Sequence, residues 1–179
     1  SPGQSLTFGR MIADRRTSVA FTGHRTYRGA AADALRRTVG ELYARGFRTF
    51  LSGMAVGFDL AAAEAVLELR ERVPGVRLVA AVPFRGQEMR FSPADRERFR
   101  RVLAEADSVE VLAPAYHRGC YAVRNDFLVD NARVLVAWYD GSPGGTRYTV
   151  RRALGRGLEV VNLCPAAPVP PAPEPTLFG

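Results

Sequence analysis

The chain has 179 residues, of which 47% are hydrophobic and 24% charged. This length suits one domain with a sizeable core, and no apolar run approaches the roughly 20 residues that span a bilayer, so a membrane protein is excluded and a cytoplasmic one expected. Cys120 and Cys164 show no metal-ligand spacing, and only His24 and His117 could join them, so no metal site is expected.

The formal net charge of +7 comes from arginine, because the chain contains no lysine. Two explanations stay open: the codon preference of a GC-rich genome, or attraction to a polyanion or a phosphorylated ligand. Arginines cluster at 96–101 and 147–156. On helices most of them would face solvent, so a nucleic-acid surface is the less favoured interpretation.

Short apolar runs alternate with amphipathic helical patterns along the chain. Strands are expected at 18–22, 48–51, 76–82, 109–112, 133–138 and 158–163, and helices at 30–45, 59–72, from 93, at 121–130 and at 146–155. The sequence Ser92-Pro93-Ala94-Asp95 is typical of a helix start, with a hydroxyl cap and proline in the first turn. Such alternation with short links predicts an α/β fold, a Rossmann-like three-layer sandwich with a mainly parallel sheet.

The predicted domain covers residues 18–163. Residues 1–17 show no clear period and are expected to be an N-terminal arm, partly foreign to the natural protein, with Met11 as a candidate natural start. Residues 164–179 contain six prolines, which favour an extended tail without regular structure.

Small and polar residues follow four of the predicted strands, in segments 22–25, 52–57, 83–88 and 140–146. The carboxyl ends of parallel strands share one edge of a sheet, and ligands bind there where the strand order reverses. Glycine in a single loop often only meets backbone geometry. Three glycine loops on one edge, each opening a helix, favour a ligand site that the backbone can approach closely.

The segment Asp140-Gly-Ser-Pro-Gly-Gly-Thr146 joins a buried strand to a helix. A glycine loop at a helix N-terminus leaves backbone amides free where the helix dipole favours negative charge, so this loop is predicted to bind phosphate. It is neither G-x-G-x-x-G nor a P-loop, which would require lysine. The chain departs from both common nucleotide fingerprints but retains their physical basis.

Two interpretations stay open for each side chain at this edge. His24 would cap its loop, or contact a ligand and transfer a proton. Arg25 would bind phosphate, or pair with Asp59 or Glu64. Asp59 would cap its helix or bond a ribose hydroxyl, and Asp140 would bond ribose or shape its turn.

Glu64 lies among alanines and would serve as a structural ion-pair partner or as an acid–base group. Tyr121, Arg124 and Asn125 share one helix face through their i, i+3, i+4 spacing. That face would clamp a base or ribose, or form ordinary polar surface.

These segments together resemble the bacterial YpsA-like proteins of the SLOG superfamily, which is named for the DNA-processing proteins DprA/Smf and the LOG phosphoribohydrolases. The resemblance rests on Phe21-Thr-Gly-His-Arg25, Ser52-Gly-Met-Ala-Val-Gly-Phe-Asp59 with Ala62-Ala-Glu64, Pro83-Phe-Arg-Gly-Gln-Glu88, Tyr121-Ala-Val-Arg-Asn125, Tyr139-Asp-Gly141 and Gly144-Gly-Thr146 with Thr149. It spans about residues 18–163. It implies a Rossmann-like fold that binds a nucleotide or a nucleotide-derived ligand.

The family motifs and the loops at the carboxyl edge of the predicted sheet together define the candidate ligand-binding residues. They are Gly23, His24, Arg25, Ser52, Gly53, Met54, Gly57, Asp59, Pro83, Phe84, Gln87, Tyr121, Arg124, Asn125, Asp140, Gly144, Gly145 and Thr146.

One departure from the family pattern bears on catalysis. The motif typical of LOG enzymes is P-G-G-x-G-T-x-x-E, and its glutamate assists cleavage of an N-glycosidic bond. In this chain the loop is shorter, and Thr149 stands at the position of that glutamate. Threonine has no titratable carboxylate, so LOG-type hydrolysis is not expected. Glu64, Glu88 and His24 remain as weaker catalytic candidates.

Three functions follow, in order of preference. The first is a sensor or regulatory domain for a nucleotide such as NAD, ADP-ribose or an AMP-like molecule, bound at the carboxyl edge of the sheet. The second is a nucleotide N-glycosidase or NAD-processing hydrolase, and the third is a DNA-associated protein related to DprA. A homo-oligomer is expected from the family resemblance alone, and no membrane partner is expected.

Overall fold

The structure, a computed structural model, describes residues 5–7 and 14–165. Its strands form one sheet in the order β1-β5-β4-β3-β2-β6-β7, and every neighbouring pair is parallel. The strands are β1 (Ser5–Thr7), β2 (Ser18–Gly23), β3 (Thr49–Ser52), β4 (Arg77–Val82), β5 (Ser108–Val111), β6 (Val134–Trp138) and β7 (Glu159–Asn162).

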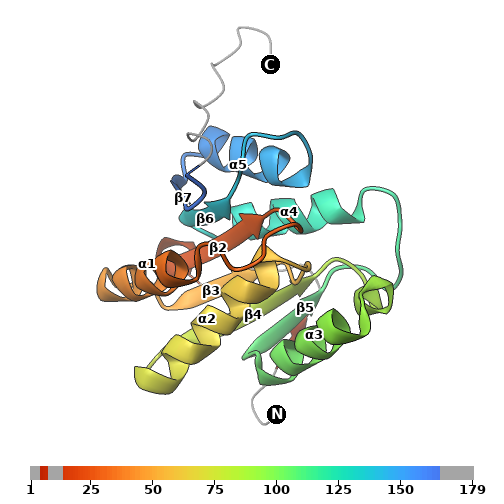
Figure 1. The fold of residues 1–179 in the computed structure, drawn as a ribbon, viewed down its shortest axis with the longest axis horizontal. Helices are drawn as coiled ribbons and strands as arrows, with labels where there is room; N and C mark the ends of the chain where they lie inside the picture. The colour runs from red at the N-terminus through yellow and green to blue at the C-terminus, as the bar shows by residue number, and fades with distance from the viewer. Residues whose placement is uncertain (1–4, 8–13, 166–179) are drawn as a thin grey trace, which may run out of the picture.

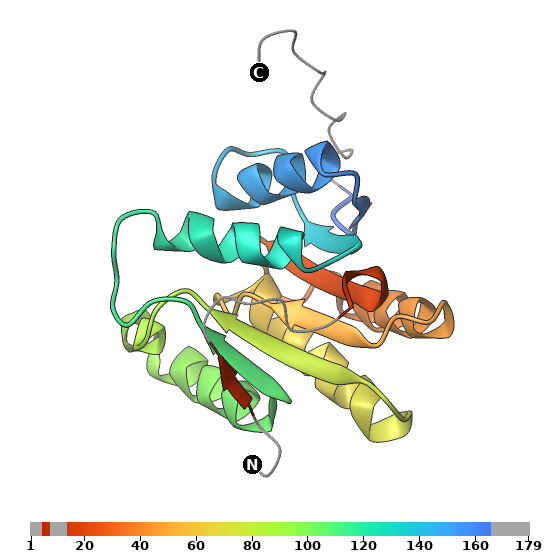
Figure 2. The same cartoon turned by 180° about the vertical axis from the view of Figure 1, so that it is seen from behind.

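Helices lie on both faces of this sheet. They are α1 (Ala32–Ala44), α2 (Phe58–Arg72), α3 (Pro93–Glu105), α4 (Cys120–Asp130) and α5 (Gly145–Gly155), with short 3-10 helices at Arg15–Thr17 and Gln87–Arg90. Helices α1, α2 and α3 cover one face (Figure 1), and α4 and α5 cover the other (Figure 2). The predicted three-layer α/β architecture is therefore confirmed.

Two hydrophobic cores, one on each face, explain why the middle of β2 and all of β6 are apolar. Along β2, Val19 and Phe21 pack into the core under α1 and α2, while Ala20 packs into the core under α4 and α5. Along β6, Val136 and Leu135 divide between the two cores in the same way. A strand buried on both faces has no solvent side, so its sequence loses the polar alternation of an exposed strand.

The six predicted strands are all present, and β1 is an addition that the sequence did not reveal. Residues 5–7 lie in the segment expected to be an arm without regular structure, yet they pair with 108–110 of β5. A strand of three residues is too short to show a period. Met11 and residues 166–179 of the proline-rich tail lie outside the described residues. No helix within 14–165 is long and apolar enough to cross a bilayer.

The strand order reverses between β2 and β6. From β2 the chain adds β3, β4 and β5 in succession on one side, then returns to place β6 on the other side of β2. Gly23 at the end of β2 pairs with Trp138 at the end of β6. The loops that follow these two strands consequently diverge from one point, which is where open α/β sheets bind ligands.

The start of α3 has the predicted cap. Ser92 Oγ accepts a hydrogen bond from the Asp95 amide at 3.2 Å, and Pro93 occupies the first turn. Ser92→Ala is expected to lower the free energy of unfolding by about 1 kcal/mol, because one helix amide loses its acceptor. Urea unfolding measures the change. Ser92→Asp, which keeps an acceptor, should retain most of the stability, and an equal loss in both variants would contradict the capping role.

Candidate functional site

A cavity of about 350 Å³ lies where the strand order reverses. Its wall is formed by the end of β2 and the loop after it, together with the first turn of α2, the first turns of α4 and the start of α5. The residues in the wall are Thr22, Gly23, His24, Arg25, Ala55, Asp59, Tyr121, Arg124, Asn125, Gly145 and Thr146. Thr22 and Ala55 are the two that the sequence did not single out, although both lie within the quoted motifs.

Helix α5 begins in this wall without a side-chain cap. Its N-cap Gly144 has φ +137°, and the first intrahelical bond runs from the Tyr148 amide to the Gly144 carbonyl at 3.1 Å. In the described part of the chain, the amides of Gly145, Thr146 and Arg147 have no protein acceptor. This end of α5 can therefore receive an anion.

Arg124 places a buried positive charge in the same cavity wall as that helix end. The residue is only 5% exposed, and its guanidinium donates from Nη1 to the Gly53 carbonyl at 2.5 Å and from Nε to Asn125 Oδ1 at 2.8 Å. Burial lowers the pKa of Arg124, and the charge of Asp59 opposes that shift. Because guanidinium titrates so far above neutrality, the cavity retains a fixed cation.

Asp59 is the carboxylate of this cavity. It is 4% exposed, its Oδ2 accepts from the Ala55 amide at 3.3 Å, and its Oδ1 is buried with no partner among the described residues. Burial raises the pKa of Asp59 to about 6, even though the charge of Arg124 acts in the opposite direction. The carboxylate therefore ties the preceding loop to α2 and leaves one oxygen unsatisfied.

The raised pKa of Asp59 predicts a pH-dependent stability. The folded state holds the proton up to about pH 6, whereas the usual pKa of an aspartic acid, which applies in the unfolded chain, is 3.8. Stability therefore falls as pH rises between these values and levels off above them. The span corresponds to about 3 kcal/mol. Unfolding free energies of the wild type and Asp59→Asn should diverge across this window in favour of the variant. Parallel curves would contradict the assignment.

The loop after β3 satisfies its own polar groups. Ser52 Oγ donates to the Asp59 carbonyl at 2.9 Å and accepts from the Met54 amide at 3.2 Å. Met54 has φ +62° and is fully buried in the core under α2. The structure thus sets Ser52, Gly53 and Met54 behind the cavity wall, where they position Asp59 and Arg124.

Two glycines of the motifs make room for protein side chains. A Cβ on Gly23 would lie 2.4 Å from Phe58 Cβ, and one on Gly53 would lie 2.8 Å from Arg124 Cδ. The sequence predicts that these glycines let a ligand approach the backbone. Their missing side chains instead admit Phe58 to the core and Arg124 to the cavity, so their contribution to a site is indirect.

His24 and Asp140 join the two loops at the reversal point. His24 Nε2 lies 2.8 Å from Asp140 Oδ1 and 3.1 Å from the Asp140 amide nitrogen. Hydrogen bonds from Ser142 are the largest cause of the lowered pKa of Asp140, and His24 adds to it. This geometry favours the loop-shaping interpretations of both residues, with His24 also in the cavity wall.

Arg25 and Tyr121 form the outer part of the wall. The Arg25 guanidinium carbon lies 5.2 Å from the centre of the Tyr121 ring, and that of Arg124 lies 5.7 Å from it. Arg25 is exposed and forms no salt bridge with Asp59 or Glu64 in the described residues. It is therefore available for a charged ligand.

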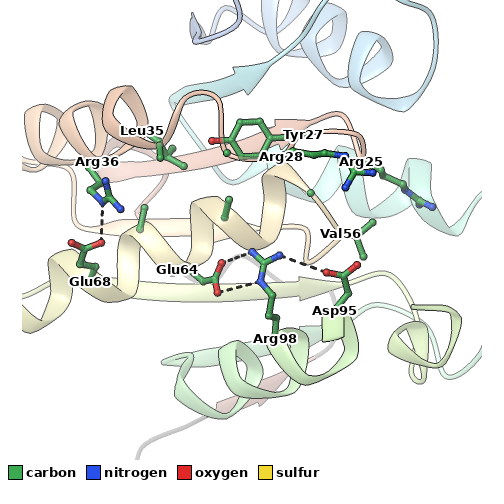
Figure 3. Close-up of a pocket in the computed structure, with 15 residues that line it drawn as sticks. Arg25, Tyr27, Arg28, Leu35, Arg36, Val56, Glu64, Glu68, Asp95 and Arg98 are labelled. Carbon is green, nitrogen blue, oxygen red and sulfur yellow. Dashed lines mark hydrogen bonds and ion pairs between the residues drawn. The ribbon is translucent and has the colours of Figure 1, made fainter. Parts of the chain in front are cut away.

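The candidate catalytic glutamates lie elsewhere. Glu64 lines a larger cavity of about 530 Å³ between α1, α2 and α3, where Arg98 bridges it to Asp95 (Figure 3). Glu88 lies on the 3-10 helix Gln87–Arg90, outside the wall of the 350 Å³ cavity. The structural ion-pair interpretation of Glu64 thus fits its surroundings.

The remaining candidates also lie outside this wall. Gly57 lines the larger cavity, Gln87 lines a smaller adjoining one, and Phe84 packs in a small cluster with Ala113 and Cys120. Pro83, Asp140 and Gly144 are also absent from the wall.

Together, the fold and the site define a Rossmann-like α/β domain with a basic cavity at the carboxyl edge of its sheet. The YpsA family model, described as the YspA SLOG family, matches residues 20–157, so the chain belongs to the YspA SLOG family.

Curated relatives come from Bacillus. The chain is 29% identical over 132 residues to a UPF0398 protein of Bacillus thuringiensis (strain Al Hakam), covering 72% of this chain and 71% of the relative. It is 28% identical over 137 residues to a UPF0398 protein of Bacillus cereus (strain G9842), covering 75% of this chain and 74% of the relative.

Two solved structures share the fold. DNA processing protein A (DprA) of Streptococcus pneumoniae superposes with a TM-score of 0.60 at 20% identity, over 80% of this chain and 48% of that one. DprA of Helicobacter pylori, whose structure concerns its single-stranded DNA binding mode, superposes with a TM-score of 0.53 at 18% identity. The match covers 80% of this chain and 64% of that one. The chain thus spans about half of the pneumococcal protein.

Proposed function

We propose that the chain binds a nucleotide-type ligand, with a phosphate seated at the start of α5, and acts as a sensor or regulatory domain. The observation that carries this proposal is the meeting of uncapped helix amides with a buried arginine in one cavity. The amides of Gly145 and Thr146 offer donors, and Arg124 supplies the charge. Phosphate is the common biological group that fits both.

The surroundings of the anion position suit the rest of a nucleotide. Asp59 Oδ1 lacks a donor among the described residues, so a ribose hydroxyl would satisfy it. The Tyr121 ring, with the Arg25 guanidinium over it, lines the same cavity. A volume of about 350 Å³ lies within the range of small-molecule sites. NAD, ADP-ribose and AMP-like molecules all present the required phosphate and ribose.

Calorimetric titration with ADP-ribose, NAD and AMP, with unphosphorylated adenosine as the reference, tests this proposal. The phosphorylated compounds should bind and adenosine should bind far more weakly. Folded protein that gives no heat with any phosphorylated compound would rule the site out.

A pair of isosteric variants sharpens the test. Asn125→Asp puts a negative charge beside Arg124 and should remove binding. Asn131→Asp makes the same change at the far end of α4, where Nδ2 of Asn131 donates to the Phe127 carbonyl at 2.8 Å, and should bind like the wild type. Equal affinity in the two variants would contradict the cavity as the binding place.

A hydrolase acting in this cavity would have Asp59 as its carboxylate. Neither Glu64 nor Glu88 lies in the wall, and Thr149 is fully buried with its Oγ1 bonded to the Gly145 carbonyl at 2.9 Å. Release of free base from AMP, lost in Asp59→Asn, would favour this second candidate over binding alone.

Single-strand DNA binding is a third candidate, favoured by one surface feature. Tyr116 is 50% exposed, and the Arg90 guanidinium lies 4.4 Å from its ring centre and 5.3 Å from that of Phe84. Aromatic rings with arginines are typical of single-strand binding surfaces. Fluorescence anisotropy with a single-stranded oligonucleotide should then show affinity that falls steeply with salt and weakens in Tyr116→Ala. Affinity independent of salt would exclude this mode.

A further inference from the structure

A second, smaller cavity adjoins the proposed phosphate site. It has a volume of about 210 Å³, and its wall includes Gln87, Arg90, Phe91 and Ser92. Arg25 and Tyr121 line both this cavity and the 350 Å³ cavity. A ligand that has its phosphate on α5 could therefore extend past Tyr121 into the smaller space.

Gln87 is the unusual residue of this smaller cavity. It is 1% exposed, yet neither its Nε2 nor its Oε1 has a hydrogen-bond partner in the described part of the chain. Its backbone is held at the start of a 3-10 helix, where the amide donates to the Phe84 carbonyl at 3.3 Å after Gly86 at φ +89°. A buried amide without partners destabilises a fold, so packing alone does not account for it.

The rings and guanidinium groups around Gln87 suit a flat molecule that stacks on them. The centre of the Tyr121 ring lies 6.0 Å from that of the Phe84 ring at an interplanar angle of 70°, and the Arg25 guanidinium lies over the Tyr121 ring. Aromatic rings and guanidinium planes stack on nucleobases without regard to their identity. The identity of the base must then be recognised by a group that both donates and accepts hydrogen bonds, and a glutamine amide is such a group.

We propose that this smaller cavity is a nucleobase subsite in which the Gln87 amide pairs with a base edge that presents an adjacent donor and acceptor, as adenine does. The inference rests on the proposed function, because the phosphate on α5 directs the base toward this cavity. Gln87 donates from Nε2 and accepts at Oε1, the two-bond pattern by which glutamine recognises adenine. A small turn of the side chain accompanies binding, since both amide atoms are buried in the free protein.

Titration of the wild type and Gln87→Met with AMP and with ribose 5-phosphate tests the subsite. The wild type should bind AMP more tightly than ribose 5-phosphate. Gln87→Met should lose about tenfold or more in affinity for AMP and keep its affinity for ribose 5-phosphate. Its melting temperature should not fall, because the substitution removes an unpartnered amide and keeps the side-chain length.

The outcomes separate the two proposals. Ribose 5-phosphate that binds as tightly as AMP, or an AMP affinity unchanged in Gln87→Met, would overturn the base subsite and leave the phosphate site standing. Failure of both ligands to bind would overturn the phosphate site and the subsite together. Asn131→Leu is the control: it also removes a buried amide whose Oδ1 lacks a partner in the described residues, but at the far end of α4, and should leave AMP binding unchanged.

The same base can come from a free nucleotide or from a nucleic-acid strand. A short single-stranded oligo-dA, titrated beside AMP, distinguishes the two sources. Tighter binding of AMP identifies the free nucleotide, and tighter binding of the strand identifies DNA. In either case the preferred ligand should lose affinity in Gln87→Met, and retention of that affinity would overturn the role of Gln87.

Discussion

Arg124→Met is expected to reduce the affinity for AMP or ADP-ribose by at least about 100-fold, which corresponds to the loss of two charge-assisted hydrogen bonds. Arg124 is the buried cation of the 350 Å³ cavity, and the protein already uses its Nε and Nη1, so Nη2 remains for the ligand. Its removal leaves Arg25, in the outer part of the wall, as the remaining arginine of the cavity. An anion would then lose the attraction of the buried cation.

Calorimetry measures this effect, and Arg70→Met provides the matched control. Arg70 lies on the last turn of α2, where Nη1 donates to the Glu105 carbonyl and to Asp107 Oδ2, both at 2.8 Å. Arg70→Met therefore also removes hydrogen bonds donated by a guanidinium, but at the opposite end of α2 from Asp59. The control should be less stable but bind normally. Comparable affinities in the two variants would show that Arg124 does not hold the ligand.

Gly57→Ala is expected to destabilise the protein by about 3 kcal/mol or more, the largest stability effect foreseen for a single methyl group. Gly57 has φ +81°, which disfavours any L side chain, and a Cβ there would lie 2.6 Å from the Arg25 carbonyl oxygen. That oxygen belongs to the backbone and cannot turn away. Relief would require the loop after β2 to separate from the N-terminus of α2, and the cavity would open with it.

Gly157→Ala isolates the conformational part of this effect. Gly157 has φ +79°, almost the same as Gly57, but a Cβ there would meet nothing within 4 Å. It should cost about 1 kcal/mol, the strain of a left-handed backbone alone. Chemical unfolding of both variants gives the difference, which measures the clash. Equal losses would mean that the close approach of the two loops contributes nothing to stability.

Most of the secondary structure could be predicted because local chemistry sets it. Strands buried on both faces read as short apolar runs, and Ser92 with Pro93 marks the start of α3 in any context. Strand β1 could not be predicted, because its three residues gain their order only by pairing with β5. Parallel pairing at a sheet edge is a long-range contact and leaves no local pattern.

The candidate site was predictable as a set of loops and not as a set of contacts. The expected meeting of the loops after β2, β3 and β6 is confirmed in outline, since His24, Asp59 and Thr146 share one cavity wall. What each motif residue does there could not be read from spacing. Gly23 and Gly53 looked like backbone openings for a ligand, but the volume that they spare is filled by Phe58 and Arg124.

The amino-acid sequence by itself determined the alternation of strands and helices, the edge of the sheet where polar loops collect, and the family. These depend on periodicity and on turn chemistry, which act over a few residues. Only the tertiary structure decided which groups find no protein partner within residues 14–165, among them the buried amide of Gln87, one buried oxygen of Asp59 and the first amides of α5. Burial and hydrogen-bond satisfaction depend on neighbours from distant segments, so they exist only once the chain has folded.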